Sequence, residues 1–274
     1  MCSVDMASRI QKVFEIFPKL GPALKKGDCG KIAVIGGAPE YTGAPYFASL
    51  APMKIGADLS YLFCPPEAAT VIKTYSPELI VHPNQDMQSI ETVINRIDSL
   101  VIGPGLGRDS KRLVPLIKNL LNRAKQDEKL GVVIDADGLF HVADCLDELK
   151  NSSRVILTPN HREFKRLYEK VFSGQQIDGI TEEHVKSLAS NLGVNVFCKG
   201  EKDFITDGRE VLIGQEKGTD RRCGGQGDLL SGAISLFIYW EKLGGQSRQD
   251  GINSYFEWSV MCKHFYSLHF EIHI

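Results

Sequence analysis

The sequence predicts an α/β fold in three layers: a mostly parallel central sheet, helices on both of its faces and a small antiparallel meander at one edge. Short runs of Val, Ile and Leu recur along the chain and alternate with helical patterns. Strands of this composition are typical of parallel sheets that are buried on both faces. Near residue 195 the pattern changes to three short strand-like runs with Gly or charged residues between them, which indicates antiparallel strands.

The individual elements follow from this alternation. The expected parallel strands are 31–35, 59–63, 79–82, 100–102, 132–135, 155–157 and 196–198. The expected helices between them are 43–57, 66–75, 88–97, 109–126, 138–149 and 161–171. After the meander, a long helix is expected from about residue 225 to residue 240. Because no repeat or low-complexity linker interrupts this order, we expect one domain over residues 27–274.

Residues 1–26 are expected to form a short N-terminal docking helix. The apolar side chains on one face of this helix are Met6, Ile10, Val13, Phe14 and Phe17. The segment lacks the apolar core of a secretory signal, and its acidic residues Asp5 and Glu15 count against a mitochondrial transit peptide. We therefore expect a cytoplasmic protein, and a mitochondrial form would need a different N-terminus.

The composition excludes several classes of function. The chain of 274 residues has 43% hydrophobic and 24% charged residues, and its 32 basic and 34 acidic side chains leave a net charge of −2. A nucleic-acid binder needs a clustered basic surface, and a membrane protein needs spans of about 20 apolar residues. The sequence has neither feature. Its seven cysteines include no Cys-x-x-Cys pair, so we expect reduced thiols and no zinc ribbon.

The residues after each strand are the candidates for a site, because ligands bind at the carboxyl ends of strands in an open parallel sheet. Gly36 and Gly37 follow the first strand, and the glycine-rich run 103–107 follows the fourth. Both patterns allow a close approach of the backbone, which either a ligand or tight packing could require. Asp135 and Asp137 follow the fifth strand, where they could face a cation or a sugar hydroxyl. Asp137 could also cap the next helix.

Polar side chains crowd the turn after the sixth strand. Asn160 and Glu163 fit a capping box at the start of a helix, but a capping box does not explain why His161 and Arg162 occupy the same turn. After the seventh strand, the run 199–203 begins with a lysine that could reach a phosphate. A plain hairpin turn accounts for that run equally well.

The strongest motif is the glycine-rich run 218–232. Gly224, Gly225 and Gly227 surround the expected start of the long helix, where free backbone N–H groups and the helix dipole favour an anion. A carboxylate at Asp228, beside an anion, is unfavourable unless it has a task. The natural task is to accept a proton from a hydroxyl that is being phosphorylated. No Walker A sequence is present, so a nucleotide must be bound in another way.

Taken together, the motifs resemble those of the ATP-dependent (S)-NAD(P)H-hydrate dehydratase family, a branch of the ribokinase-like superfamily of carbohydrate kinase domain-containing proteins. The matching runs are 31–37, 41–46, 75–79, 103–107, 135–138, 158–163, 199–200 and 222–228. The resemblance implies a ribokinase-like three-layer sandwich and a lyase that repairs NADH and NADPH after hydration of the nicotinamide ring. Such enzymes phosphorylate the ring hydroxyl of the S epimer with ATP, and loss of phosphate restores the double bond.

The resemblance also implies roles for individual residues. Asp228 would be the general base, with Gly225, Gln226 and Gly227 forming the anion hole. The hydrate (NADHX or NADPHX) would be held by Asp228 and by Gly107, Asn160, His161, Arg162, Glu163, Phe164, Lys165 and Arg166. ATP would be held by the three anion-hole residues and by Lys199, Gly200, Glu201, Lys202, Asp203, Gly218, Thr219, Asp220, Arg221, Arg222, Cys223 and Gly224. Mg²⁺ is expected through the ATP phosphates, and no protein ligand is assigned to a metal.

Two further expectations come from the family. A functional partnership with an NAD(P)HX epimerase is implied, and a homo-oligomer is compatible with the resemblance. From about residue 262 the chain departs from the family pattern, which suggests an atypical or truncated C-terminus and incomplete cover over the helix at 229–239.

Two other functions remain open from the residues alone. One is a ribokinase-like kinase of a small vitamin or sugar alcohol, which would share Asp228 and its glycines. The other is a nucleotide-binding sensor without turnover, which would not require the Asp228 carboxylate. The runs 103–107 and 160–163 match the dehydratase branch, and they therefore favour the dehydratase over both of these functions.

Overall fold

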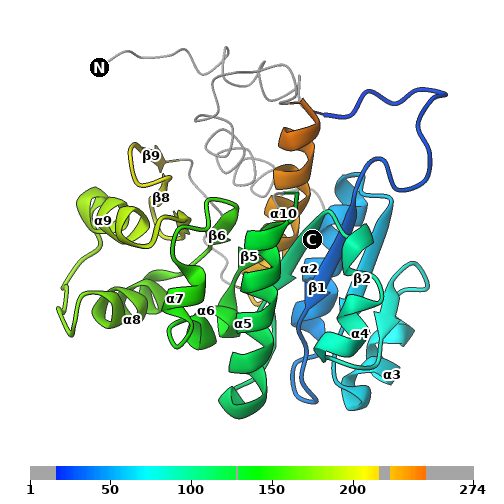
Figure 1. Cartoon of the computed structure of the whole chain (residues 1–274), viewed down its shortest axis with the longest axis horizontal. Helices are drawn as coiled ribbons and strands as arrows, with labels where there is room; N and C mark the ends of the chain where they lie inside the picture. The colour runs from blue at the N-terminus through cyan, green and yellow to red at the C-terminus, as the bar shows by residue number, and fades with distance from the viewer. Residues whose placement is uncertain (1–16, 128, 216–222, 245–274) are drawn as a thin grey trace.

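The computed structural model describes residues 17–127, 129–215 and 223–244. Within them the chain forms a nine-stranded sheet with helices packed around it (Figure 1). The strands are β1 (Lys31–Ile35), β2 (Leu59–Phe63), β3 (Ile80–His82), β4 (Ser99–Ile102), β5 (Gly131–Ile134), β6 (Val155–Leu157), β7 (Asn195–Cys198), β8 (Asp203–Thr206) and β9 (Val211–Gly214). The helices are α2 (Gly43–Ile55), α3 (Pro66–Tyr75), α4 (Met87–Glu91), the 3-10 turn η1 (Ile94–Arg96), α5 (Ser110–Gln126), α6 (Ala136–Val142), α7 (Leu146–Leu149), α8 (His161–Val171), α9 (Glu182–Leu192) and α10 (Gln226–Gly244).

The strand order along the sheet is β3-β2-β1-β4-β5-β6-β7-β8-β9. Pairing is parallel from β3 to β7, and β8 and β9 continue the sheet in antiparallel. The predicted fold class is confirmed, including the antiparallel meander at one edge. The order of the strands reverses between β1 and β4, and ligand sites of open α/β sheets lie at such switch points, outside the carboxyl ends of the strands.

The seven predicted parallel strands are all present, with bounds that differ from the prediction by one residue at most. Two predicted helices are wrong as continuous elements. The run 88–97 divides into α4 and η1, and the run 138–149 divides into α6 and α7. In both runs the backbone hydrogen bonds change from the α-helical spacing of four residues to a spacing of three. For example, the N–H groups of Asp144 and Cys145 donate to the carbonyls of His141 and Val142. Such tight turns end an α-helix. Helix α9 was not among the predicted elements.

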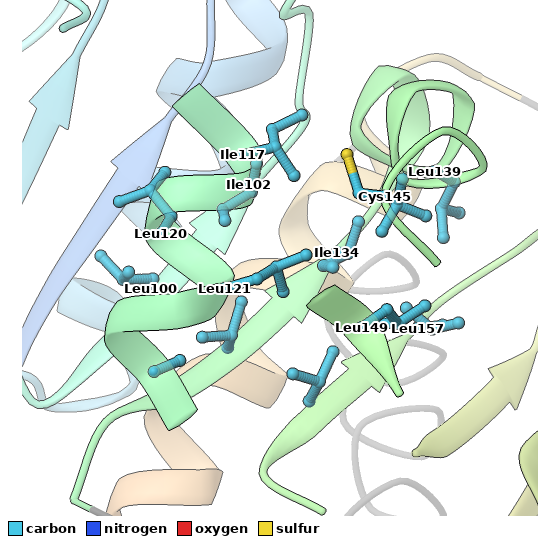
Figure 2. Close-up of a cluster of buried hydrophobic side chains, with 14 of the residues drawn as sticks. Leu100, Ile102, Ile117, Leu120, Leu121, Ile134, Leu139, Cys145, Leu149 and Leu157 are labelled. Carbon is cyan, nitrogen blue, oxygen red and sulfur yellow. The ribbon is translucent and has the colours of Figure 1, made fainter. Parts of the chain in front are cut away.

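Side chains alternate along each parallel strand between two hydrophobic cores, one on each face of the sheet. On one face, residues such as Leu100 and Ile102 of β4 meet the buried side of α5, whose Ile117, Leu120 and Leu121 point toward the sheet (Figure 2). This core also includes side chains from α6, α8 and α9. Most of these residues are fully buried. Because apolar side chains occupy this face of the sheet, the polar residues of the predicted site lie at the strand ends.

The other face is covered by α2, α3 and α10. Helices α2 and α10 pack closely on each other, because a Cβ at Gly232 of α10 would lie only 2.2 Å from the Ala48 carbonyl oxygen of α2. The side chains of Leu236, Phe237 and Trp240 on α10 are buried there. Helix α10 is therefore held along the sheet, with its N-terminus at the strand ends.

The two ends of the chain are only partly described. Most of the predicted docking helix lies outside the described residues, but the Phe17 ring packs on Trp240 of α10, with 5.1 Å between ring centroids. The atypical terminus expected from residue 262 lies outside the described residues as well. The single catalytic domain stays a prediction. None of the helices described here combines the length and apolarity that a membrane crossing requires, and the five described cysteines carry free thiols.

Candidate active site

Two loops that follow β1 and β4 pack directly on each other. The Gly37 N–H donates to the Pro104 carbonyl at 3.0 Å, and a Cβ at Gly36 would lie 2.3 Å from the same oxygen. Gly103 has φ +128° and approaches the backbone carbonyl of Asp135 so closely that any Cβ would collide with it. These glycines are thus required for backbone packing, which was one of the two alternatives left open by the sequence. The packed loops form a rigid floor at the switch point of the sheet.

Asp137 holds the end of the loop that follows β4 through two hydrogen bonds. It accepts from the Gly107 N–H at 3.0 Å and from Arg108 Nε at 2.8 Å. Gly107 itself has φ +82°, and its carbonyl lies 2.8 Å from Nε2 of the buried His141. A capping role for Asp137 is wrong, because α6 begins at Ala136 and Asp137 lies inside its first turn. Sequence analysis did not single out His141.

The capping box at α8 is confirmed. Asn160 Oδ1 accepts from the N–H groups of Arg162 and Glu163, and Glu163 Oε2 accepts from the Asn160 N–H at 2.8 Å. Burial raises the pKa of Glu163, although the hydrogen bond from Asn160 opposes this effect. Asn160 also forms a parallel bridge to Lys199 at the end of β7, so the turn after β6 and the turn after β7 are joined.

The remaining residues of the run 160–166 point in different directions. His161 and Arg162 are exposed, and Phe164 is fully buried in the core beneath α8. Lys165 Nζ donates to the carbonyl of Asp178. A contact between Phe164 and a ligand would therefore have to come from its backbone.

Lys199 forms an ion pair with Asp135 in the depth of the site. The distance from Nζ to Asp135 Oδ1 is 2.6 Å, and the two side chains are 21% and 2% exposed. Burial acts to lower the pKa of Lys199, but the Asp135 carboxylate, with contributions from Glu163 and Asp228, more than offsets burial and raises it. Of the partners that the sequence left open for Asp135, the structure shows a cation, and this cation is a lysine of the chain itself.

Asp228 is the third residue of α10 and lies beside this pair. The pKa of Asp228 is raised to about 7, first by burial and then by the Asp135 carboxylate. The Lys199 ammonium group opposes this rise, and the carboxylates of Asp137 and Glu163 add smaller upward effects. Among the residues that the structure describes, no side-chain hydrogen bond joins the Asp228 carboxylate to a partner. A carboxylate that is half protonated near neutral pH can accept a proton from a bound hydroxyl.

Two glycines at the start of α10 lie against the Phe47 ring and the Asp135–Lys199 pair. Gly225 has φ +92° and packs on the Phe47 ring of α2. A Cβ at Gly227 would lie 3.3 Å from Lys199 Nζ, so the backbone of α10 passes directly over the ion pair. The first N–H groups of a helix have no partner within the helix, and here they lie next to Asp228. This arrangement can hold an anion beside the Asp228 carboxylate.

The sequence of this chain matches a known protein family over most of its length. A family model described as NAD(P)H-hydrate dehydratase matches residues 32–267. The chain belongs to the NAD(P)H-hydrate dehydratase family. It is 45% identical over 252 residues to the ATP-dependent (S)-NAD(P)H-hydrate dehydratase of Pongo abelii, which covers 90% of this chain and 76% of that protein.

Solved structures share the fold of this dehydratase family member. A ribokinase-like superfamily protein from Enterococcus faecalis superposes with a TM-score of 0.73 at 20% identity, covering 94% of this chain and 84% of that one. The ADP/ATP-dependent NAD(P)H-hydrate dehydratase from Bacillus subtilis, co-crystallised with ATP and Mg²⁺, superposes with a TM-score of 0.66 at 18% identity, covering 96% and 89%. The ribokinase-like fold predicted from the sequence is therefore confirmed.

The part of the predicted ATP run that is described divides into separate local structures. Gly218, Thr219, Asp220, Arg221 and Arg222 lie outside the described residues. In the turn after β7, the Gly200 N–H donates to Asp203 Oδ1 at 2.8 Å, while Glu201 and Lys202 are exposed at its tip. Cys223 accepts a hydrogen bond from Gln226 Nε2 at 3.4 Å. In this dehydratase family member, Lys199 of the run 199–203 acts electrostatically on the Asp228 carboxylate.

A pair of arginines that sequence reasoning did not connect lies beside Gly107. The guanidinium groups of Arg108 and Arg166 both stack on the Phe140 ring, with 4.3 and 4.8 Å to its centroid. Burial, and then the charge of Arg108, lower the pKa of Arg166. Within the described residues, the buried Arg166 Nε has no hydrogen-bond partner. Two cations in such proximity favour an anionic ligand.

A cavity of about 650 Å³ lies at the carboxyl ends of β1, β2 and β3, away from the Asp228 cluster. Pro39, Pro65 and Asn84 line it, together with Gln85 and Arg112. Gln85 is buried, donates to the Gly36 carbonyl and accepts from Arg112. The cavity therefore borders the same glycine loops from the other side, and no motif in the sequence indicated it.

Proposed function

We propose that this protein is an ATP-dependent (S)-NAD(P)H-hydrate dehydratase, which converts the hydrated dinucleotide to NADH or NADPH and releases ADP and phosphate. The observation that carries this proposal is Asp228, which lies at the N-terminus of α10 with a pKa near neutrality and the glycine backbone of residues 225–227 beside it. Membership of the family and the name of the Pongo abelii relative support it.

The reaction proceeds by phosphorylation and elimination. Asp228 removes the proton of the ring hydroxyl, whose oxygen attacks the γ-phosphorus of ATP, so that the bond to ADP breaks and a phosphate ester forms. The N–H groups of Gly225, Gln226 and Gly227 stabilise the negative charge on the transferring phosphoryl group. The carbon–oxygen bond then breaks as the adjacent ring nitrogen donates its electron pair. Phosphate leaves with the oxygen, and loss of a proton from the neighbouring ring carbon restores the double bond.

The hydrate is proposed to bind between Gly107 and the run 160–166. Gly107, Asn160 and Glu163 are held by hydrogen bonds in this region, which gives a preorganised wall. The Arg108 and Arg166 guanidinium groups provide positive charge for the phosphates of a dinucleotide. ATP is proposed to approach from the side of the turn 199–203 and the residues that precede α10.

Magnesium is proposed to enter with the nucleotide. The strand-end carboxylates that could ligate a metal already have partners, because Asp135 pairs with Lys199 and Asp137 pairs with Arg108. This donor set fits a cation that is coordinated by phosphate oxygens rather than by a cage of protein ligands, as is usual for Mg²⁺. Bound in this way, Mg²⁺ would neutralise the charge on the phosphates that flank the transferred group.

The proposed cellular setting follows from the substrate. We propose a cytoplasmic enzyme that acts together with an epimerase, since a dehydratase specific for the S epimer leaves the R epimer unused. Assembly as a homo-oligomer is part of the same proposal, supported by the family resemblance alone.

The decisive experiment is incubation of the purified protein with (S)-NADPHX, ATP and Mg²⁺ while the absorbance at 340 nm is recorded. The expected result is a rise in absorbance with one phosphate released per NADPH formed, and no rise with Asp228→Asn. A stable phosphate ester without a rise at 340 nm would support the kinase alternative instead. Binding of ATP without consumption of either substrate would support the sensor alternative.

A further inference from the structure

The Asp135–Lys199 ion pair is built by parts of the chain that are far apart in sequence. Asp135 follows β5 and Lys199 ends β7, on either side of β6. The Lys199 N–H donates to the Pro159 carbonyl at 2.8 Å, which fixes the backbone from which the side chain extends. Nζ then meets Oδ1 of the buried Asp135 at 2.6 Å, while the Lys199 side chain is only partly buried. The ammonium group is thus held in one place by its backbone and by its partner.

The backbone of α10 leaves room for this pair directly beside the proposed base. A Cβ at Gly227 would lie 3.3 Å from Lys199 Nζ and 3.7 Å from Asp135 Oδ2. Asp228 is the next residue in the chain. Because Gly227 has no side chain, no atoms of this residue beyond the backbone separate the pair from the start of α10.

The charges around Asp228 are unequal. The carboxylates of Asp135, Asp137 and Glu163 act on it, and the largest opposing effect comes from the Lys199 ammonium group. Asp137 is paired with Arg108, and Glu163 accepts a hydrogen bond from the Asn160 backbone. The balance of charge at Asp228 therefore depends on whether Asp135 and Lys199 are both present.

We propose that Asp135 and Lys199 are a positioning pair that sets the protonation state of Asp228, and that Lys199 is held in this role rather than serving only as a ligand of ATP. This inference rests on the proposed function, in which Asp228 is the general base. Lys199 favours the carboxylate form of Asp228, which is ready to accept a proton. Asp135 keeps the ammonium group at a fixed distance and limits how strongly it acts on Asp228.

The proposal predicts opposite effects for the two members of the pair. Asp135→Asn removes an anion and releases Lys199 toward Asp228, so the acidic limb of the pH–rate profile moves to lower pH. Lys199→Met removes the cation, so the limb moves to higher pH. Charges within a few ångströms shift such groups by about 1 pH unit or more. Lys199→Arg keeps the charge and is expected to return the limb toward its original position.

Two additional variants separate this effect from loss of structure. Lys199→Met leaves Asp135 as an unpaired buried carboxylate, which destabilises the fold. The double variant Asp135→Asn/Lys199→Met removes both charges. The acidic limb of its pH–rate profile is expected between those of the two single variants. Lys118→Met is the matched control, because Lys118 forms a comparable ion pair with Glu148 at 2.9 Å between α5 and α7, outside the site. The acidic limb of the pH–rate profile of Lys118→Met is expected to stay at the wild-type position.

The test has two readouts. The first is kcat/KM as a function of pH with (S)-NADPHX and Mg²⁺-ATP. The second is the titration of the Asp228 carboxyl by NMR in protein labelled with ¹³C at the aspartate side-chain carboxyl, with the Asp228 signal assigned by Asp228→Asn and no substrate present. The inference is overturned if neither readout shifts in opposite directions for the two single variants. It is also overturned if Lys199→Met raises KM for ATP while the Asp228 titration stays unchanged. If the wild-type protein forms no NADPH, the proposed function fails, and the NMR titration still decides the charge effect.

Discussion

Two glycine-rich segments lie at the same edge of the sheet, and the glycines meet different surroundings in each. In the run 103–107, a Cβ at Gly103 would lie 1.8 Å from the Asp135 carbonyl oxygen, and a Cβ at Gly105 would lie 2.8 Å from the Tyr41 side chain. No rotation of a side chain relieves a collision with backbone. Glycine is therefore required in this run so that two loops can pack.

In the segment before α10, the glycines do not meet backbone. A Cβ at Gly224 would meet nothing within 4 Å, and a Cβ at Gly225 would press on the Phe47 ring at 2.9 Å. Here glycine is not required by neighbouring backbone, and its benefit is room for a ligand close to the N–H groups of α10. The comparison teaches that one kind of pattern supports the fold in the first segment and the proposed anion site in the second.

The largest effect is expected from a matched pair of alanine substitutions. Gly103→Ala forces a Cβ into the Asp135 carbonyl at φ +128°, and we expect little or no folded protein. Gly224→Ala is the control, and we expect its stability to change by less than about 1 kcal/mol. Thermal melts followed by circular dichroism would compare them. Similar melting temperatures for the two variants would contradict the distinction between the segments.

Asp228→Asn is expected to leave the fold intact and reduce the rate of NAD(P)H formation by about 10²–10⁴-fold, the usual cost of losing a positioned general base. ATP binding should persist or tighten, because a negative charge leaves the phosphate site. Asp144→Asn, an exposed carboxylate outside the site, is the control. Turnover of Asp228→Asn within threefold of the wild type would show that another group removes the proton.

Gly225→Val tests whether the second segment binds ATP. A β-branched residue is strained at φ +92° and would press on the Phe47 ring. Since a ring can shift where a backbone cannot, we expect a folded protein whose affinity for ATP falls at least about tenfold, a difference of roughly 1.4 kcal/mol. Calorimetric titration with Mg²⁺-ATP measures this affinity. An unchanged affinity would mean that these glycines form only a packing turn.

The smallest effect concerns pH. Burial first, and then Asp135, raise the pKa of Asp228 to about 7, and a general base acts only when it is deprotonated. We expect kcat/KM to fall about tenfold per pH unit below pH 7 and to level off above it. In the folded state this raised pKa favours the protonated acid, so stability contributed by Asp228 declines as the pH rises from about 4 to about 7. Asp228→Asn should therefore be more stable than the wild type at pH 8, and this advantage should shrink toward pH 4.

The elements with regular patterns could be predicted from the sequence because their signal is local. The strands 31–35, 59–63 and 155–157 were predicted with the bounds that the structure has, since an apolar run between turn residues needs little context. Helix α9 was missed although its signal was present: Thr181 caps it, Val185, Leu188 and Leu192 recur at helical spacing, and Gly193 closes it in a left-handed conformation. The omission reflects incomplete interpretation of a local pattern rather than a lack of one.

The sequence by itself determined the order of the elements and the residues that lie at the strand ends, because side-chain periodicity and helix caps depend on neighbours in the chain. Only the tertiary structure decided what those residues contact. From the sequence, Lys199 could reach a phosphate or lie in a plain hairpin turn, and in the fold it pairs with Asp135, 64 positions away. Asp137 was a candidate helix cap, but it holds Gly107 and Arg108. Ion pairs and burial depend on which strands lie side by side, so the charge on Asp228 is a property of the folded sheet.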